Sequence, residues 1–176
     1  MTPGMIHIPT LETERLTLRA PAARDLDPFA AFFASPENTQ YLGGSKTKPE
    51  TWRYLGEVIG HWAMRGFGRW IVCRKGSDTP VGLVGLHEPL DWPETEVGWY
   101  IWDGKGEGFA TEAGAAARAW AYTTLGLTTL VSIITPGNSA SIRVAEKMGA
   151  TRAPDWDHPR HGALLVYRHP GPGGRI

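Results

Sequence analysis

Hydrophobic residues recur along the chain with two spacings, one typical of helices and the other typical of strands. Apolar residues three or four positions apart predict amphipathic helices from Ala23 to Ser35 and from Pro49 to Met64. Shorter segments rich in β-branched and aromatic residues predict strands. The expected strands are Arg15–Arg19, Arg69–Arg74, Val81–His87, Glu94–Trp102, Thr128–Thr135 and Ala163–Arg168.

The second half of the chain adds two helices to this pattern. An Ala-rich segment from Phe109 to Leu125 is followed by Gly126, and a segment from Ser139 to Met148 is followed by Gly149. Glycine directly after a helical pattern is a common helix stop. The order of strands and helices predicts an α/β fold in which a mixed sheet carries about four packed helices.

The length of 176 residues fits a single domain over residues 1–176. Residues 1–10 contain two prolines and are expected to form a loose lead-in. Residues 169–176 are rich in proline and glycine and are expected to be a disordered tail.

Composition narrows the classes of protein to consider. The chain has 18 basic and 18 acidic residues, so it has no general electrostatic reason to bind nucleic acid or an anionic membrane. It shows no apolar run as long as a membrane span and no charged-then-apolar leader. The single cysteine, Cys73, cannot form an internal disulfide, and its apolar neighbours predict a buried strand residue. These features together predict a cytoplasmic protein.

A glycine-rich turn at residues 104–108 is the most informative segment for function. Gly104, Gly106 and Gly108 lie between an expected strand and an expected helix. Free backbone N–H groups and the helix dipole make such a turn suitable for an anion, most often a phosphate. The turn matches neither the P-loop nor the dinucleotide-binding fingerprint. Taken alone, it fits a phosphate site and a plain glycine-rich loop equally well.

The order of motifs around this turn resembles the GCN5-related N-acetyltransferase (GNAT) family. Lys105 to Ala110 resembles the family's pyrophosphate loop, Gln/Arg-x-x-Gly-x-Gly/Ala, with Lys105 as a departure at the basic position. The helix, strand and Asn138-x-x-Ser141 that follow also resemble the family. Leu11–Arg19 and Glu96–Ile101 resemble its RimJ/RimL-type branch, which acetylates N-terminal amines of ribosomal proteins. The resemblance extends from about Leu11 to Tyr167.

This resemblance implies a mostly antiparallel sheet that splays between strands 94–102 and 128–135, where coenzyme A enters. It implies acetyl-CoA as the co-substrate and no metal. The residues that it assigns to coenzyme A are Trp99, Ile101, Lys105, Gly106, Gly108, Phe109, Ala110, Thr111, Asn138 and Ser141.

The catalytic residues are less clearly indicated. The family often uses a tyrosine seven residues after the Asn of the second helix to protonate the leaving thiolate, and that position is Ala145 here. Ser141 is the residue that the RimJ/RimL-type branch is thought to use instead. Alternatively, Asn138 and Ser141 only cap their helix, because both residue types are common in a first turn.

Glu96 is the candidate general base. It alternates with Trp99 and therefore faces the side of the strand opposite the Trp99/Ile101 row. A surface carboxylate, or an ion pair with a nearby arginine, explains Glu96 equally well. An N-terminal amine costs only about 1–2 kcal/mol to deprotonate at neutral pH, so a general base is not essential.

Other polar and aromatic residues surround the expected site. Acidic residues before and after strand 94–102 form either a rim that favours a cationic acceptor or a solvated loop; they are Asp91, Glu94, Glu96 and Asp103. A second polar cluster is expected in a solvated loop rather than at a metal, because Pro159 disrupts helical His spacing; it contains Asp155, Asp157, His158 and His161. Some of the loop tryptophans are expected to line an acceptor pocket; they are Trp92, Trp102 and Trp156. His61 is expected to be a partly buried structural residue.

The sequence thus favours an N-acetyltransferase in which an amine attacks acetyl-CoA directly in a ternary complex. The acceptor is either a protein N-terminus or a small amine, and the protein is a monomer or a homodimer. The alternative is a non-catalytic acyl-CoA-binding or regulatory module, for which the missing tyrosine leaves room. A nucleotide-binding protein is disfavoured, because the corresponding motifs are absent from the sequence.

Overall fold

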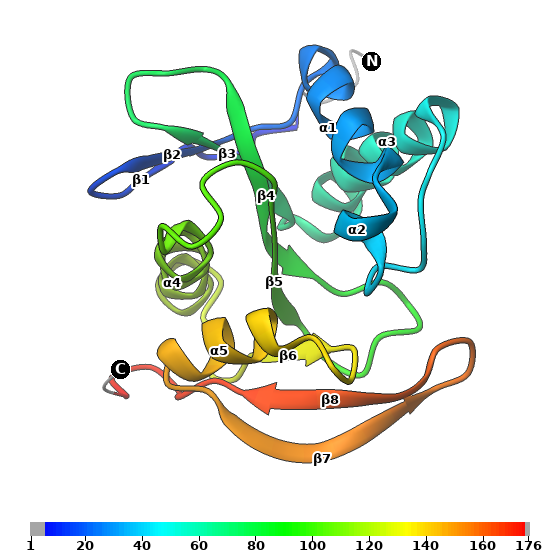
Figure 1. Ribbon diagram of the computed structural model, residues 1–176. Helices are drawn as coiled ribbons and strands as arrows, with labels where there is room; N and C mark the ends of the chain where they lie inside the picture. The colour runs from blue at the N-terminus through cyan, green and yellow to red at the C-terminus, as the bar shows by residue number, and fades with distance from the viewer. Residues whose placement is uncertain (1–5, 175–176) are drawn as a thin grey trace.

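The computed structural model describes residues 6–174, which build one eight-stranded sheet (Figure 1). The strands lie in the order β1-β2-β3-β4-β5-β6-β8-β7, and all neighbours are antiparallel except β5 and β6. Their bounds are β1 Leu11–Glu12, β2 Leu16–Arg19, β3 Arg69–Arg74, β4 Pro80–His87, β5 Glu96–Ile101, β6 Val131–Ile134, β7 Thr151–His158 and β8 Gly162–Arg168. The predicted mixed, mostly antiparallel sheet is confirmed.

The sheet opens between β5 and β6, as predicted. These parallel strands pair only at Glu96 and Val131 and diverge beyond that point. The Ser132 hydroxyl donates a hydrogen bond of 2.6 Å to the Val97 carbonyl where the strands begin to part. The rest of β5 therefore presents an edge toward the interior of the molecule.

Helices cover both faces of the sheet. Figure 1 shows the first three helices on one side of β3–β5, α4 on the other side, and α5 beside β6. Their bounds are α1 Leu26–Ala34, α2 Pro36–Thr39, α3 Lys48–Arg65, α4 Phe109–Thr124 and α5 Ser139–Lys147. The expected helix from residue 23 begins as a 3₁₀ turn at Ala23–Asp25, and the short α2 was not predicted. No helix within residues 6–174 combines the length and apolarity needed to cross a membrane.

The boundaries of α3 follow from its local sequence. The Thr47 hydroxyl accepts a hydrogen bond from the Glu50 N–H, and the Glu50 carboxylate accepts one of 2.7 Å from the Thr47 N–H. This capping box satisfies donors that a helix start leaves free. Gly66 ends the helix in the left-handed conformation, with φ of 75°.

Two hydrophobic cores fill the space on either side of the sheet. One packs α4 through small residues such as Ala113, Ala117 and Ala121 against β2–β5. The other joins α1 and α3 to the opposite face through Phe29, Phe33 and their neighbours. Cys73 belongs to this second core and is fully buried, as predicted.

Asp155, Asp157 and His158 were expected in a loop but belong to the edge strand β7. Most of its residues are exposed, so it lacks the apolar alternation that reveals a strand. Pro154 lies where the pairing register with β8 shifts between Ala153 and Trp156. An edge position and a bulge are the places where a sheet tolerates proline.

The ends of the chain are more tightly held than expected. His169 is 3% exposed, and its N–H donates to the Leu130 carbonyl at 2.9 Å. Tyr122 donates its hydroxyl proton to the Pro170 carbonyl at 2.8 Å. At the other end, the Trp70 indole donates to the Pro9 carbonyl at 2.7 Å. His169 and Pro170, expected in a disordered tail, and Pro9, expected in a loose lead-in, are therefore held by contacts within the fold; residues 1–5 and 175–176 lie outside the described residues.

Candidate active site

The glycine turn forms an anion cradle at the start of α4. Gly104, Gly106 and Gly108 all have positive φ, at 79°, 86° and 84°. Only glycine adopts this conformation readily, which explains the three glycines in five residues. The backbone N–H groups of residues 108–111 have no hydrogen-bond partner within the described part of the chain. They converge where the helix dipole is positive and can therefore bind a phosphate group.

The N-terminal motif braces this turn through Glu112. The Glu112 carboxylate accepts hydrogen bonds from the Thr13 hydroxyl at 2.6 Å, the Arg15 N–H at 2.9 Å and the Arg15 Nε at 2.7 Å. Arg15 also donates to the Glu107 carbonyl at 2.9 Å. Burial works against the ionised carboxylate, but the Thr13 and Arg15 hydrogen bonds outweigh it and lower the pKa of Glu112.

The Phe109 ring is buried beneath the turn rather than open to a ligand. The guanidinium groups of Arg15 and Arg74 lie 5.0 and 5.1 Å from its centroid, within the range of cation–π contact. An added Cβ at Gly104 would lie 2.5 Å from this ring. Phe109 thus supports the loop with its side chain and offers only its backbone N–H to an anion.

A groove of about 400 Å³ runs from the turn along β5 to the start of α5, and we call it the donor groove. All ten residues predicted to bind coenzyme A line it, from Trp99 and Ile101 on β5 to Asn138 and Ser141 at α5. Lys105, Arg143 and Lys147 add three cationic side chains, and none of them forms an ion pair among residues 6–174. The free N–H groups and these cations fit a ligand that carries several phosphates.

A second cavity of about 460 Å³ lies farther along β5, toward the start of this strand, and we call it the acceptor cavity. Glu96, Arg69 and His87 line it. The acceptor cavity and the donor groove share lining residues, among them Tyr41, Trp99, Tyr100, Asn138 and Ser141. The two spaces therefore meet where β5 and β6 part.

Asn138 and Ser141 lie at this junction. The Asn138 side-chain carbonyl accepts a hydrogen bond of 3.2 Å from the Ser141 N–H, so the capping role weighed from the sequence is confirmed for Asn138. The Ser141 hydroxyl makes no side-chain hydrogen bond with the described residues. Ala145, at the position of the family's usual tyrosine, is fully buried in a core with Ile134 and Tyr167.

Glu96 is a buried carboxylate, 5% exposed, on the face of β5 opposite Trp99. The Arg69 guanidinium lies 3.0 Å from its Oε1, which confirms the ion pair and excludes the surface carboxylate. Arg69 also donates to the Tyr54 hydroxyl at 2.6 Å. Burial raises the pKa of Glu96, opposed by Arg69 and the Trp92 indole. The Trp92 Nε1 is itself buried and has no hydrogen bond of ordinary geometry with the described residues.

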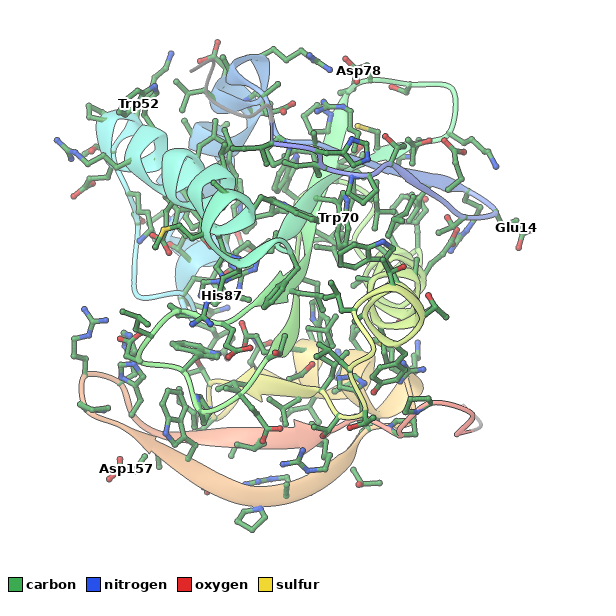
Figure 2. All side chains as sticks on the ribbon, turned by 180° about the vertical axis from the view of Figure 1, so that it is seen from behind. Glu14, Trp52, Trp70, Asp78, His87 and Asp157 are labelled. Carbon is green, nitrogen blue, oxygen red and sulfur yellow. The ribbon has the colours of Figure 1, made fainter. Side chains whose placement is uncertain are left out.

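His87 lies directly across the β4–β5 pairing from Glu96. Figure 2 shows it at the end of β4, in the interior of the molecule. Burial, followed by the nearby Arg69, lowers the pKa of His87 to about 2, so its ring is neutral at physiological pH. His61 stacks on it at 5.4 Å; the partly buried His61 accepts from the Glu88 N–H and donates to the Phe67 carbonyl, as expected of a structural residue.

Sequence reasoning missed several residues of the acceptor cavity. Tyr100 shares a strand face with Glu96, and the two-residue period of β5 could have indicated it. Arg69, His87, Tyr54 and Tyr41 come from other elements, and no local pattern links them to Glu96.

The acidic residues around β5 do not form a free acidic rim. Each carboxylate lies within ion-pair distance of an arginine: Asp91 of Arg160, Glu94 of Arg168, Glu96 of Arg69 and Asp103 of Arg74. The free acidic rim is therefore wrong. The solvated loop fits Asp91 and Asp103, which are 47% and 59% exposed, but not the buried Glu96.

The positions of the loop tryptophans and of the second polar cluster differ in part from the predictions. Trp92 lines the acceptor cavity, whereas Trp102 packs on Phe29 in the core. His158 is 2% exposed and lies beside Trp92 and Trp156. The prediction of a solvated loop is wrong for His158, because the β7–β8 hairpin folds its ring inward. Residues 6–174 contain no group of three or more side chains placed to hold a metal ion.

A glycine turn with free N–H groups that leads through a splayed sheet to a second cavity fits a transferase that uses an acyl-coenzyme A. The chain belongs to the GNAT family: the family model for the acetyltransferase (GNAT) domain matches residues 15–151. It is therefore an acetyl-CoA-dependent acyltransferase, and the family uses acetyl-CoA as the acetyl donor.

Individual proteins agree with this assignment. An acetyltransferase from Agrobacterium tumefaciens str. C58 has 38% sequence identity and a TM-score of 0.85, covering 93% of this chain and 95% of that one. The uncharacterized N-acetyltransferase YoaA of Bacillus subtilis (strain 168) is 29% identical over 80% of this chain and 82% of its own length. RimL, a ribosomal L7/L12 alpha-N-protein acetyltransferase solved with coenzyme A, shares the fold at 15% identity, with a TM-score of 0.75 over 92% of this chain and 97% of that one.

Proposed function

We propose that the protein transfers the acetyl group of acetyl-CoA to a primary amine, either a protein N-terminus or a small amine, by direct attack in a ternary complex. One observation carries this proposal. The donor groove and the acceptor cavity meet at Trp99, Asn138 and Ser141, so a thioester in the groove and an amine in the cavity can approach each other there.

The donor side holds the phosphates and the arm of the co-substrate. The N–H groups of residues 108–111 bind the pyrophosphate, and Lys105, Arg143 and Lys147 add positive charge along the groove. The splayed edge of β5 provides backbone groups that pair with the pantetheine amides and polarise the thioester carbonyl. Asn138 keeps its side-chain amide free to donate to the arm, because only its carbonyl is used in the cap.

Glu96 and Ser141 perform the two proton transfers. Glu96 takes a proton from the acceptor ammonium, directly or through a water molecule, and its raised pKa suits a base that works near neutral pH. The amine nitrogen then forms a bond to the acetyl carbon while the carbon–sulfur bond breaks. The Ser141 hydroxyl donates a hydrogen bond to the leaving thiolate and passes its proton to the sulfur. The proton that the acetylated nitrogen then loses returns Ser141 to its neutral form. Both residues line the acceptor cavity.

A thiol-release assay tests this proposal. The protein is incubated with acetyl-CoA and a panel of small amines and N-terminal peptides, and free coenzyme A is measured over time. We expect at least one amine to accelerate release far above hydrolysis. If acetyl-CoA binds but no acceptor exceeds water, the protein is instead the non-catalytic acyl-CoA-binding module.

A further inference from the structure

Five tyrosine and tryptophan side chains line the acceptor cavity, together with aliphatic and polar residues. Rings reach it from α3 with Tyr54, from the loop before β5 with Trp92, and from β5 itself with Trp99 and Tyr100. At about 460 Å³ the cavity has the size of an ordinary small-molecule site. Such walls favour an acceptor with a flat or apolar body.

Trp92 is held firmly in this wall by other rings. Its ring centroid lies 5.2 Å from that of Trp156, 5.4 Å from that of His87 and 5.6 Å from that of His158, all near edge-to-face. The neighbouring Asp91 forms an ion pair of 2.9 Å with Arg160, which joins this loop to the β7–β8 hairpin. Because these contacts fix the indole, Trp92 offers a rigid apolar surface to a bound acceptor.

The charges of the cavity cancel within the protein. Among the described residues that line it, Glu96 carries the only carboxylate and Arg69 the only guanidinium group. These two groups form an ion pair at 3.0 Å. The cavity also contains no lysine or aspartate. Glu96 can accept the proton of one amine, but no second carboxylate faces the cavity.

The carboxylates that directly flank the cavity lining in the chain already have partners. Asp91 and Glu94 lie 2.9 and 2.7 Å from the guanidinium groups of Arg160 and Arg168. Glu88 lies 3.8 Å from the Arg65 guanidinium and accepts a hydrogen bond from the Thr95 hydroxyl. A second ammonium group inside the cavity would find no free carboxylate among the described residues that line it. Burying an unpaired charge is strongly unfavourable.

We infer that the acceptor carries one cationic group, the amine that becomes acetylated, on an uncharged and largely apolar body, and that polyamines are poor acceptors. This inference rests on the proposed function, because it takes Glu96 as the site of the reacting amine. It makes Trp92 a specificity-determining residue of the acceptor cavity.

Matched amines test the inference. Initial rates with saturating acetyl-CoA give kcat/KM for pentylamine, 1,5-diaminopentane and 2-phenylethylamine. The first two differ by one terminal ammonium group, and the third tests the aromatic walls. We expect pentylamine to exceed 1,5-diaminopentane at least tenfold, and 2-phenylethylamine to exceed pentylamine. Equal or higher kcat/KM for the diamine would overturn the inference while leaving amine acetylation intact.

A binding measurement separates this inference from the proposed function. Calorimetry with the complex of protein and coenzyme A, which cannot transfer acetyl, gives the affinity for the same three amines. If none is acetylated but 2-phenylethylamine still binds at least tenfold more tightly than 1,5-diaminopentane, the proposed function fails while the preference of the cavity for a singly charged, apolar amine is supported. If 2-phenylethylamine does not bind, the inference is wrong.

Two tryptophan variants complete the test. Trp92→Ala should lower kcat/KM for 2-phenylethylamine at least tenfold, and Trp92→Phe should restore most of it. Trp52 provides the control, because it is 63% exposed on the outer surface of α3 (Figure 2). Trp52→Ala should leave kcat/KM within twofold. An unchanged preference in folded Trp92→Ala would remove Trp92 from the specificity site.

Discussion

The Glu112 carboxylate accepts hydrogen bonds from the Thr13 hydroxyl and the Arg15 N–H, which join two motifs that lie about a hundred residues apart in the chain. Sequence comparison identifies the two motifs separately, as an opening strand and a glycine turn. The structure shows that they form one unit, in which the first motif fixes the helix start that carries the free N–H groups.

Glu112→Gln should destabilise the protein by about 1–3 kcal/mol, because charge-assisted hydrogen bonds are weakened. Folding keeps the pKa of Glu112 below its ordinary value of 4.5, so its contribution is complete above that pH and disappears as the pH falls further. Urea unfolding should therefore show a difference between wild type and variant at pH 7 that shrinks in acid. Glu146 is exposed on α5, so Glu146→Gln should change neither the free energy of unfolding at pH 7 nor its dependence on pH.

Gly108→Val should weaken acetyl-CoA binding at least tenfold, since a branched side chain would strain the positive φ and crowd the N–H groups of the turn. Gly126 is a matched control. It lies just beyond the other end of α4 with φ of 70° and open space around it. Gly126→Val should lose a similar amount of stability but bind acetyl-CoA normally in calorimetry. Equal loss of acetyl-CoA binding in both variants would refute the role of the glycine turn in binding acetyl-CoA.

Ser141→Ala should lower kcat by about 10- to 100-fold, within the range of general acid catalysis, and leave the affinity for acetyl-CoA within twofold. The comparison requires steady-state rates and direct binding on the same preparation. Ser139→Ala, an exposed serine in the same helical turn, should behave as wild type. A larger effect on affinity than on kcat would make Ser141 a binding residue instead of the acid.

Glu96→Gln should remove the acidic limb of the pH–rate profile. A base must be ionised, so kcat/KM should rise with pH through the Glu96 pKa, which burial places above 4.5. The variant also leaves the buried Arg69 charge without its partner, at a cost of about 3–5 kcal/mol. Glu96→Asp provides a second reading if the first variant does not fold. The control variant Glu94→Gln should keep the acidic limb of the pH–rate profile. If folded Glu96→Gln also keeps this limb, Glu96 is not the base.

His169 should make folding stability depend on pH between 6.5 and 4. Burial, followed by Arg118, lowers its pKa from 6.5 to about 4. Stability is complete above 6.5 and falls as the unfolded state takes up a proton, by about 2 kcal/mol between pH 7 and pH 5. Chemical unfolding should show this loss in wild type and a smaller one in His169→Gln. Identical losses would mean that His169 does not titrate as inferred.

The sequence predicts this structure best where one residue type meets one physical requirement. The three glycines of the turn, the alternation of Glu96 with Trp99 and the capping role of Asn138 all follow from local geometry. Long-range partners do not, so the Glu96–Arg69 pair could be named only as an ion pair with some arginine.

Local composition misleads at two places for related reasons. Pro154 suggests a loop, but a bulge at the sheet edge accommodates it. The segment that begins at His169 is rich in proline and glycine, yet the His169 ring contacts Ser132 and Arg118 in the interior. In both cases tertiary contacts override the local preference.

The single paired position between β5 and β6 has a consequence for how specificity can change. Beyond Glu96 and Val131, the splayed strands offer main-chain groups, which are the same for every amino acid. Recognition of the donor through such groups is insensitive to which side chains β5 carries. The acceptor cavity is instead assembled from side chains of several separate elements. Substitutions there can redirect the enzyme to a new amine while the machinery that holds acetyl-CoA stays intact.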